Sequence, residues 1–276
     1  MPDLDVLRDR LRELDRVVVA FSGGADSALL AWVAHDTLGP DRALAVTAVS
    51  PSLAPEEEAD CRELAEEWGL HWTPVFTDEL ANPAYALNDG ERCYFCKAEL
   101  LDVLGPLAEA HGFAAVATGT NADDAVAGFR PGIRAAAERG AVTPLRDAGF
   151  TKDQVRVASR AWDLPTWDKP AAACLSSRVA FGVEVSPFRL ARVERAEAAA
   201  RAALAATGID VRDLRVRDTG DRARLEVDAT RVEEVRAAPA VLAAVLDAGF
   251  GEAELDPDGF RSGSMNELLA EPERFR

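Results

Sequence analysis

A short apolar segment that leads into a glycine turn constrains the fold of this chain most. Residues 16–21, RVVVAF, form a near-continuous apolar run of strand length. Such a run is typical of a parallel strand that is buried on both faces of a sheet. The turn SGGADS follows at residues 22–27, and residues 25–38 have the composition of a helix. A strand, a glycine turn and a helix in this order predict a βα unit of a parallel sheet.

The same alternation of strand and helix continues as far as residue 162. Further strands are expected at residues 42–49, 71–76 and 113–118. Helices are expected at residues 3–14, 55–69, 92–111 and 151–162, the last with Thr151 as its N-cap. Repeated units of this kind predict an α/β fold with a doubly wound, mainly parallel sheet.

The pattern changes after about residue 183. A long helix is expected at residues 187–207, followed by a hairpin of residues 214–216 and 223–227. Two short helices at 229–237 and 239–248 and a strand at 252–255 complete the chain. We therefore expect a larger α/β domain at residues 1–183 and a smaller C-terminal α+β domain at residues 184–276.

Charge and hydropathy limit the partners that the chain can have. The net charge is −17, whereas a protein that grips a nucleic-acid backbone usually presents a basic surface. No apolar run is long enough to cross a bilayer, and the N-terminal residues lack the apolar core of a signal peptide. We expect a cytoplasmic protein with a small-molecule substrate and no nucleic-acid or membrane partner.

The glycine turn has the composition of a phosphate-binding loop. Gly23 and Gly24 allow backbone N–H groups to approach an anion, Ser22 and Ser27 add hydroxyl donors, and the helix N-terminus adds a favourable dipole. Asp26 is the expected ligand of a Mg²⁺ ion that bridges the phosphates of ATP. The loop lacks the lysine of a Walker A motif, which favours attack at the α-phosphate with release of pyrophosphate. The alternative is a glycine turn with an ordinary helix cap.

A second loop follows the strand expected at residues 113–118. It has the sequence TGTNADD at residues 118–124, and in a doubly wound sheet it lies on the same edge as the first loop. Gly119 and Thr120 are expected to contact the nucleotide, and Asp123 and Asp124 are expected to bind Mg²⁺ or to orient the nucleotide. The alternative is a capped helix with acidic residues in its first turn, which needs no ligand.

Three cysteines are candidates for metal or sulfur chemistry. Cys93 and Cys96 form a CxxC pair at the start of a helix, and Cys174 lies far downstream. Three thiolates can hold three irons of a 4Fe–4S cluster and leave the fourth iron open. The alternatives are sulfur donation by Cys174 beside a structural CxxC pair, a zinc site, a redox pair or unrelated core residues. Cys61 matches the apolar face of its helix and is expected in the core.

The SGGADS loop resembles the SGGxDS signature of the PP-loop ATP-pyrophosphatases. Five further strings extend the resemblance to one subgroup, the LarE family of ATP-dependent sulfur transferases that build the nickel-pincer nucleotide cofactor. These strings are RCYFCK at 92–97, GTNADD at 119–124, CLSSR at 174–178, the RVR and ARLE strands at 215–217 and 223–226, and DGFRSGSM at 258–265.

The resemblance implies a particular reaction. ATP adenylates a carboxylate of pyridinium-3,5-biscarboxylic acid mononucleotide and pyrophosphate leaves; sulfur then displaces AMP to give a thiocarboxylate, and the second carboxylate follows. In one branch of the family the residue that matches Cys174 gives up its own sulfur. In the other branch three cysteines hold a 4Fe–4S cluster that supplies sulfide, and Cys93, Cys96 and Cys174 place this chain there.

The resemblance also implies the substrate site and a homo-oligomeric assembly. Arg215 and Arg217 would bind the mononucleotide phosphate, since residues two apart on a strand share a face and guanidinium groups suit phosphate. Glu226 would orient nearby groups, and Glu197 is a further candidate from the long helix. Arg178 would bind a carboxylate or phosphate and stabilise the Cys174 thiolate. The alternative is a solvated, charged strand face.

Three other functions fit parts of the sequence. A tRNA thiolase with a three-cysteine cluster would share the loop and the cysteines, but the acidic charge opposes it. An ammonia-dependent amide synthetase of the NAD synthetase type would use the loop and leave the cysteines without a role. A nucleotide-sensing module would bind ATP without releasing pyrophosphate.

Overall fold

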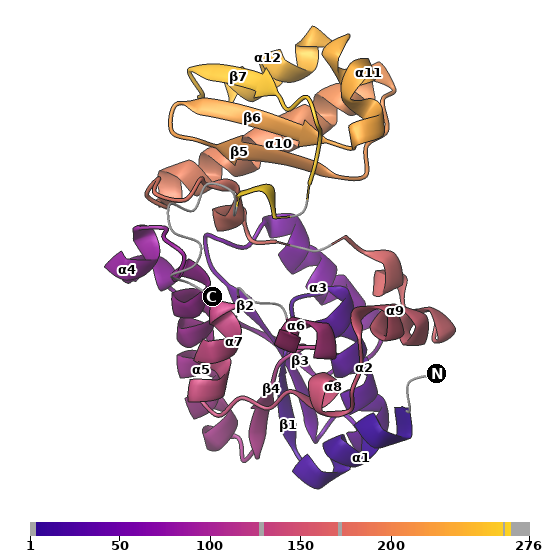
Figure 1. The fold of residues 1–276 in the computed structure, drawn as a ribbon. Coiled ribbons are helices and arrows are strands. Elements are labelled where there is room, and N and C mark those ends of the chain that lie inside the picture. Colours follow the sequence, from indigo (N-terminus) through magenta and orange to yellow (C-terminus); the bar gives the residue numbers. More distant parts are fainter. Residues whose placement is uncertain (1–3, 127–129, 171–172, 262, 266–276) are drawn as a thin grey trace. The chain divides into compact units, whose positions relative to one another are not determined.

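A computed structural model of the chain describes residues 4–126, 130–170, 173–261 and 263–265 (Figure 1). Contacts between residues divide the chain into two compact units. The first unit contains residues 1–79 and 93–172. The second contains residues 173–275 together with residues 80–92, a segment that lies between two elements of the first unit in the sequence.

The first unit is built on a four-stranded sheet in which every neighbouring pair is parallel. Its order is β3 (Trp72–Phe76), β2 (Ala43–Val49), β1 (Val17–Ala20) and β4 (Ala115–Ala117). The central strand β1 is the apolar run that precedes the glycine turn. The parallel sheet predicted from the alternating elements is therefore confirmed.

Helices cover both faces of this sheet, as a doubly wound fold requires (Figure 1). Val17 and Val19 pack in one cluster with α1 (Leu4–Leu14), α2 (Ala25–Leu38), α3 (Pro55–Glu67) and α9 (Lys152–Ala161). Val18 packs in a second cluster with α5 (Arg92–Ala110) and α7 (Pro131–Glu138). The two clusters take alternate residues of β1 because successive side chains of a strand point to opposite faces.

Several short elements were not expected from the sequence. They are η1 (Glu79–Ala81), α4 (Pro83–Ala86), α8 (Pro144–Asp147) and η2 (Pro165–Asp168). The helix α7 was also missed. The helix α6 (Ala122–Val126) is the capped helix that the sequence left open as the alternative for the second loop. The expected N-cap of α9 is confirmed, since the Thr151 hydroxyl accepts from the Gln154 N–H and the Gln154 side chain accepts from the Thr151 N–H.

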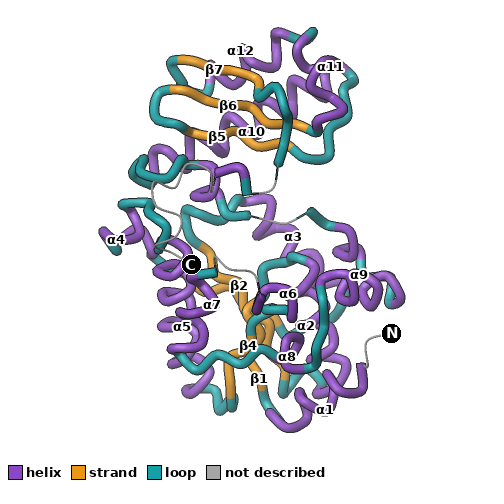
Figure 2. Tube along the Cα trace, in the orientation of Figure 1, coloured by secondary structure: helices purple, strands orange, loops and turns teal. Residues whose placement is uncertain are grey.

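The second unit contains a three-stranded mixed sheet (Figure 2). The strands β5 (Leu214–Asp218) and β6 (Arg222–Val227) form the expected antiparallel hairpin, and β7 (Glu252–Leu255) pairs with β6 in parallel. The remaining elements are η3 (Leu175–Arg178), α10 (Pro187–Thr207), η4 (Ala229–Arg231), α11 (Val232–Arg236) and α12 (Pro239–Asp247). The smaller α+β unit predicted from the sequence is confirmed.

None of the helices that the structure describes is long and apolar enough to cross a membrane.

Candidate functional site

The glycine turn closes on itself at the carboxyl end of β1. The hydroxyl groups of Ser22 and Ser27 lie 3.0 Å apart, and the Ser22 N–H donates to Ser27 Oγ at 3.2 Å. Ser27 Oγ lies 3.1 Å from the carbonyl oxygen of Gly24, to which it donates. These bonds fix both hydroxyls and the loop backbone, an arrangement that suits an anion site.

Glycine is required at two positions, one in each loop, for different structural reasons. Gly23 has a φ of 66°, in the left-handed region that favours glycine, and a Cβ there would lie 3.0 Å from the Cys61 sulfur. Gly119 is required by space, because a Cβ there would lie 2.9 Å from the Ser27 backbone nitrogen. The two loops therefore meet at one edge of the sheet, as the sequence predicted. Cys61 is fully buried in the core, where burial raises the pKa of its thiol to about 11.

Asp26 is held between two residues from other elements. Its Oδ2 lies 2.5 Å from the Lys152 ammonium, and its Oδ1 accepts from the Asn121 side chain at 3.2 Å. Lys152 is the first residue of α9, and its own N–H donates to Asp123 Oδ2 at 2.7 Å. Sequence reasoning missed Lys152, because a single lysine 126 positions away gives no local signal.

The second loop is the capped helix start that was one of the two alternatives from the sequence. Asn121 caps α6, since its Oδ1 accepts from the N–H groups of Asp123 and Asp124 at 2.9 and 3.1 Å. Asp124 also lines the cavity between the loops, whereas the Asp123 carboxylate accepts from Lys152. The loop is thus a capped helix start that still presents carboxylates beside Asp26.

A cavity of about 300 Å³ lies between the two loops and the end of β2. Its polar wall comes from both loops and its apolar wall from β2, the segment after it and α5. The lining residues are Ala20, Phe21, Ser22, Gly24, Asp26, Ser27, Val46, Thr47, Ala48, Leu53, Lys97, Leu100, Thr118, Gly119, Thr120 and Asp124. A polar edge and an apolar wall are what a nucleotide needs for its phosphates and its base.

Lys97 is the cationic side chain in this wall. It belongs to the RCYFCK string, in which sequence reasoning considered only the cysteines. Burial lowers the pKa of the Lys97 ammonium, and the charges of Cys96 and Cys93 raise it to a lesser extent. A desolvated ammonium in a cavity with an anion-binding loop is suited to phosphate oxygens.

The three candidate cluster cysteines are distributed over both units. Cys93 is exposed and Cys96 half-buried in the first unit, whereas Cys174 is half-buried in the second. The start of α7 packs tightly against the CxxC turn, since a Cβ on Gly132 would lie 3.3 Å from the Cys93 carbonyl oxygen. Within the described residues, no three His, Cys, Asp or Glu side chains gather into a metal site. The cluster stays a prediction.

Cys174 lies at the N-cap of η3, and Arg178 at the end of that turn holds it. The buried Arg178 guanidinium donates to the carbonyl oxygens of Ala173 and Cys174, the latter at 3.0 Å. It also forms an ion pair with Glu197 of α10 at 2.9 Å. Glu197 in turn accepts from the Val216 N–H of β5 at 3.0 Å, so Arg178 and Glu197 connect the cysteine turn to the strand.

Arg215 and Arg217 lie two residues apart on β5 and are both buried, unlike a solvated strand face. Arg217 pairs with Glu226 at 2.7 Å and donates to the Ser177 carbonyl oxygen at 3.2 Å. Arg215 lies over the Phe260 ring at 5.5 Å. Burial lowers the pKa of Arg215, and the positive charges of Arg178 and Arg217 lower it further.

The second-unit site is formed by Cys174, Arg178, Glu197, Arg215, Arg217 and Glu226. Its three guanidinium groups are buried, and two of them pair with the carboxylates of Glu197 and Glu226. Guanidinium groups form charge-assisted hydrogen bonds with phosphate and carboxylate oxygens. The site therefore joins donors that suit such a ligand to the turn that carries Cys174.

Comparison with known proteins gives three relatives and one family model. The model of the NAD synthase family matches residues 4–87. An uncharacterised protein of Synechocystis is 42% identical over 96% of this chain and 97% of its own length. The pyridinium-3,5-bisthiocarboxylic acid mononucleotide synthase of Lactiplantibacillus plantarum is 34% identical over 94% of this chain and 92% of its own length. An uncharacterised protein of Methanocaldococcus jannaschii is 24% identical over 93% of this chain.

The parallel sheet, the glycine loop and the NAD synthase match define a PP-loop protein, and both comparisons indicate an ATP-using enzyme. Within that class, the chain belongs to the LarE family that includes the Lactiplantibacillus synthase, because the similarity covers nearly all of both chains. The resemblance seen in the sequence strings is thereby confirmed.

Proposed function

We propose that this chain is an ATP-dependent sulfur transferase of nickel-pincer nucleotide cofactor synthesis. Its substrate would be pyridinium-3,5-biscarboxylic acid mononucleotide, whose carboxylates become thiocarboxylates. The observation that supports this most is the second-unit site, where the Cys174 turn is joined to a buried arginine cluster through Arg178 and Arg217. An amide synthetase would need neither the thiol nor its connection to the arginines.

In the first step a substrate carboxylate oxygen attacks the α-phosphorus of ATP, and pyrophosphate leaves. The loop N–H groups and the hydroxyls of Ser22 and Ser27 would hold the pyrophosphate. Asp26 and Asp124 offer the hard carboxylate oxygens that Mg²⁺ prefers, and both line the cavity. Lys97 would neutralise charge that develops on the phosphate oxygens.

In the second step sulfur attacks the acyl carbon of the adenylate, and AMP leaves with the bonding electrons. Arg215 and Arg217 would hold the phosphate of the mononucleotide, while Glu226 keeps Arg217 in place. If Cys174 is the direct donor, a thioester forms first; removal of its α-proton then breaks the Cβ–S bond and leaves dehydroalanine and the thiocarboxylate.

The source of sulfur is the finer part of this proposal. Cys93, Cys96 and Cys174 form no disulfide and have at least partial exposure, so three cysteines that a 4Fe–4S cluster could use are present in the chain. Such a cluster, when bound with one iron open, would supply sulfide to the acyl adenylate. Assembly as a homo-oligomer is part of the same proposal and rests on the family resemblance.

Two variants test the two steps separately. Asp26→Asn should reduce pyrophosphate release by about a hundredfold or more, because the metal-binding charge is lost. Asp36→Asn, on the same helix but exposed and paired with Arg8, is the matched control. Cys174→Ala should keep pyrophosphate release and abolish thiocarboxylate formation. Loss of both steps in Cys174→Ala would mean that this cysteine is structural and would contradict the proposal.

Iron and sulfide analysis of protein purified without oxygen tests the sulfur source. About four irons per chain and a broad visible absorption band would support the cluster. Iron-free protein after attempted reconstitution would leave Cys174 as a donor that its own reaction consumes. Multiple turnover that persists in Cys93→Ser would also argue against the cluster.

An ammonia-dependent amide synthetase is the second candidate, because the NAD synthase model matches residues 4–87. That match covers the glycine loop but not the second-unit site. Incubation with ATP, the mononucleotide and ammonium, followed by mass spectrometry, separates the two functions. An amide product without added sulfide would favour the synthetase.

A further inference from the structure

A segment between β3 and α5 packs against the turn that carries Cys174. Residues 80–92 belong to the second unit, although the elements on either side of them in the sequence belong to the first. Three buried side chains of this segment, Tyr85, Asn88 and Arg92, contact the chain that follows Cys174. We call these three residues the clasp.

Two members of the clasp hold Ser176, which lies two residues after Cys174. The Tyr85 hydroxyl lies 2.6 Å from Ser176 Oγ. Arg92 Nη1 donates to the Ser176 carbonyl oxygen at 2.8 Å and to Asn88 Oδ1 at 2.6 Å. Ser176 is fully buried, so water cannot take the place of the bonds that Tyr85 and Arg92 make to it.

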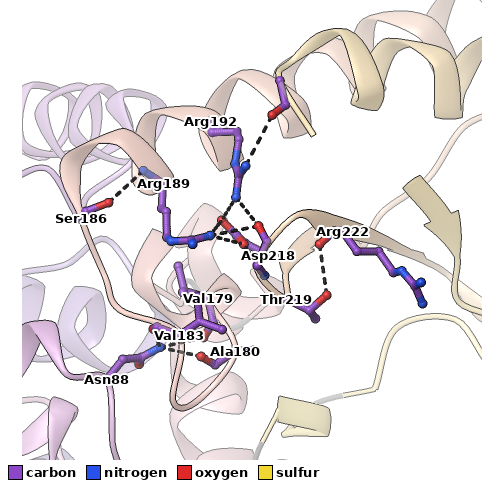
Figure 3. Close-up of polar contacts among 12 residues, drawn as sticks. Asn88, Val179, Ala180, Val183, Ser186, Arg189, Arg192, Asp218, Thr219 and Arg222 are labelled. Atoms are coloured by element: carbon purple, nitrogen blue, oxygen red, sulfur yellow. Dashed lines mark hydrogen bonds and ion pairs between the residues drawn. The ribbon is translucent and has the colours of Figure 1, made fainter. Parts of the chain in front are cut away.

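Asn88 holds the next part of the same chain (Figure 3). Its Nδ2 donates to the carbonyl oxygens of Val179, Ala180 and Val183 at 3.2, 2.8 and 2.8 Å. Asn88 has a φ of 55°, a left-handed conformation that asparagine tolerates better than most residues. Its carbonyl oxygen also accepts from the Gly182 N–H at 3.1 Å, so the segment and the turn are bonded in both directions.

The opposite side of residues 176–183 is bonded to β5. The Ala180 N–H donates to the Asp218 carbonyl oxygen at 2.8 Å, and Asp218 is the last residue of the strand that carries the site arginines. The Asp218 carboxylate is fully buried between Arg189 and Arg192, at 2.8 and 2.6 Å (Figure 3). The turn is therefore fixed between the clasp on one side and a rigid strand end on the other.

We propose that the clasp is a set of positioning residues that fixes Cys174 in register with the substrate arginines on β5. This inference rests on the proposed function, in which Cys174 is the sulfur donor or a ligand of the cluster that donates. In either case it must lie at a fixed place relative to a substrate whose phosphate Arg215 and Arg217 hold. A displacement of the order of 1 Å between reacting groups lowers the rate by about a hundredfold. Donors aimed at four carbonyl oxygens of residues 176–183 restrict such a displacement, whereas an apolar contact would leave the turn free to slide.

The test compares Asn88→Gly and Tyr85→Phe with Leu87→Ser. Glycine keeps the left-handed backbone of Asn88 and removes the amide, and phenylalanine removes a single hydroxyl. Leu87 lies in the same segment with a side chain that is 66% exposed, so its variant controls for local change. Three quantities are measured: hydrogen exchange of residues 174–183, the alkylation rate of Cys174 by peptide mapping, and the ratio of thiocarboxylate formed to pyrophosphate released.

The clasp predicts a specific pattern in Asn88→Gly. Exchange protection of residues 176–183 falls about tenfold, and pyrophosphate release stays close to that of the parent. The transfer ratio, which is the thiocarboxylate formed per pyrophosphate released, falls about tenfold. Tyr85→Phe shows the same pattern with smaller changes, and Leu87→Ser matches the parent. A transfer ratio that is unchanged while protection is lost would overturn the proposal, because the turn would then need no positioning.

Failure of the proposed function would look different. If the parent itself forms no thiocarboxylate, the sulfur-transferase proposal falls. The alkylation rate of Cys174 then decides the clasp alone: a change of about fivefold in Asn88→Gly supports it, and an unchanged rate overturns it.

Discussion

At the scale of single residues, Gly119 shows how closely the glycine turn and the second loop meet. Its backbone is not in the left-handed region, so glycine is needed there because of space alone. A Cβ would lie 2.9 Å from Ser27 N and 3.1 Å from the Asp26 carbonyl carbon, and backbone atoms have no flexible end that can move aside. Substitution must therefore displace one loop from the other.

Gly119→Ala should weaken ATP binding by about tenfold or more, because the displaced loop no longer matches the phosphates. Gly105→Ala is the control, since Gly105 lies inside α5 and, apart from its chain neighbours, nothing lies within 4 Å of a Cβ there. The gain in helix propensity is opposed by the clash of Pro106 with a preceding Cβ, so the control should change stability by less than about 1 kcal/mol. Calorimetric titration with ATP measures the first effect and thermal unfolding the second; equal ATP affinities for both variants would contradict the close approach of the loops.

Lys97 predicts a dependence of stability on pH. Burial lowers its pKa below the ordinary 10.5, so the folded state binds fewer protons than the unfolded state between those two values. The destabilisation by this ammonium is complete below the lowered pKa and disappears as the pH rises to 10.5. Lys97→Met should therefore raise Tm at pH 7, by an amount that shrinks towards pH 10, while ATP binding weakens. A Tm difference that is the same at both pH values would exclude this cause.

At the scale of elements, the strands and long helices of the sheet could be predicted because their signals are local. The apolar run before Ser22 and the cap at Thr151 lie within the segments that they specify. The helices α4, α6 and α8 have four or five residues each and begin or end in turns. They are too short for their apolar residues to show a helical period. The packing of residues 80–92 with Ser176 depends on partners about ninety positions away and leaves no local pattern.

The helix α9 links stability to the candidate site at the glycine turn. Thr151 caps it through a complete capping box, and Lys152 directly after it pairs with Asp26. Thr151→Ala should lower stability by about 1 kcal/mol, which corresponds to a fall in Tm of about 2–4 °C. The fraying of the first turn should also raise the KM for ATP.

Arg156→Ala is the control for this prediction, because Arg156 lies on the exposed side of the same helix. It should change stability by less than about 0.5 kcal/mol. An equal loss of stability in both variants would contradict a specific contribution of the cap.

At the scale of the whole molecule, the candidate site divides into a part that the sequence reveals and a part that only folding brings together. The glycine loop, the second loop and the RVR strand are each a continuous stretch of sequence, so the chemistry of each is visible in the sequence. Lys97 and Lys152 become site residues only when the sheet places helices around the loops. The ion pair of Arg178 with Glu197 and that of Arg217 with Glu226 are equally invisible before η3, α10 and β5 pack together.

The net charge of the chain favours a mononucleotide over tRNA as the substrate. At a net charge of −17 the long-range field repels polyanions, and the repulsion grows with the number of phosphates. We expect no retention of tRNA transcripts below about 100 µM protein at about 50 mM salt, and no pyrophosphate release that depends on tRNA. For the mononucleotide, KM should fall when salt rises from about 10 to about 150 mM, because the Debye length shortens from about 30 to about 8 Å while the buried arginines are screened little. Tight tRNA binding that weakens with salt would show that a local basic surface overrides the net charge, and it would favour the thiolase over the mononucleotide enzyme.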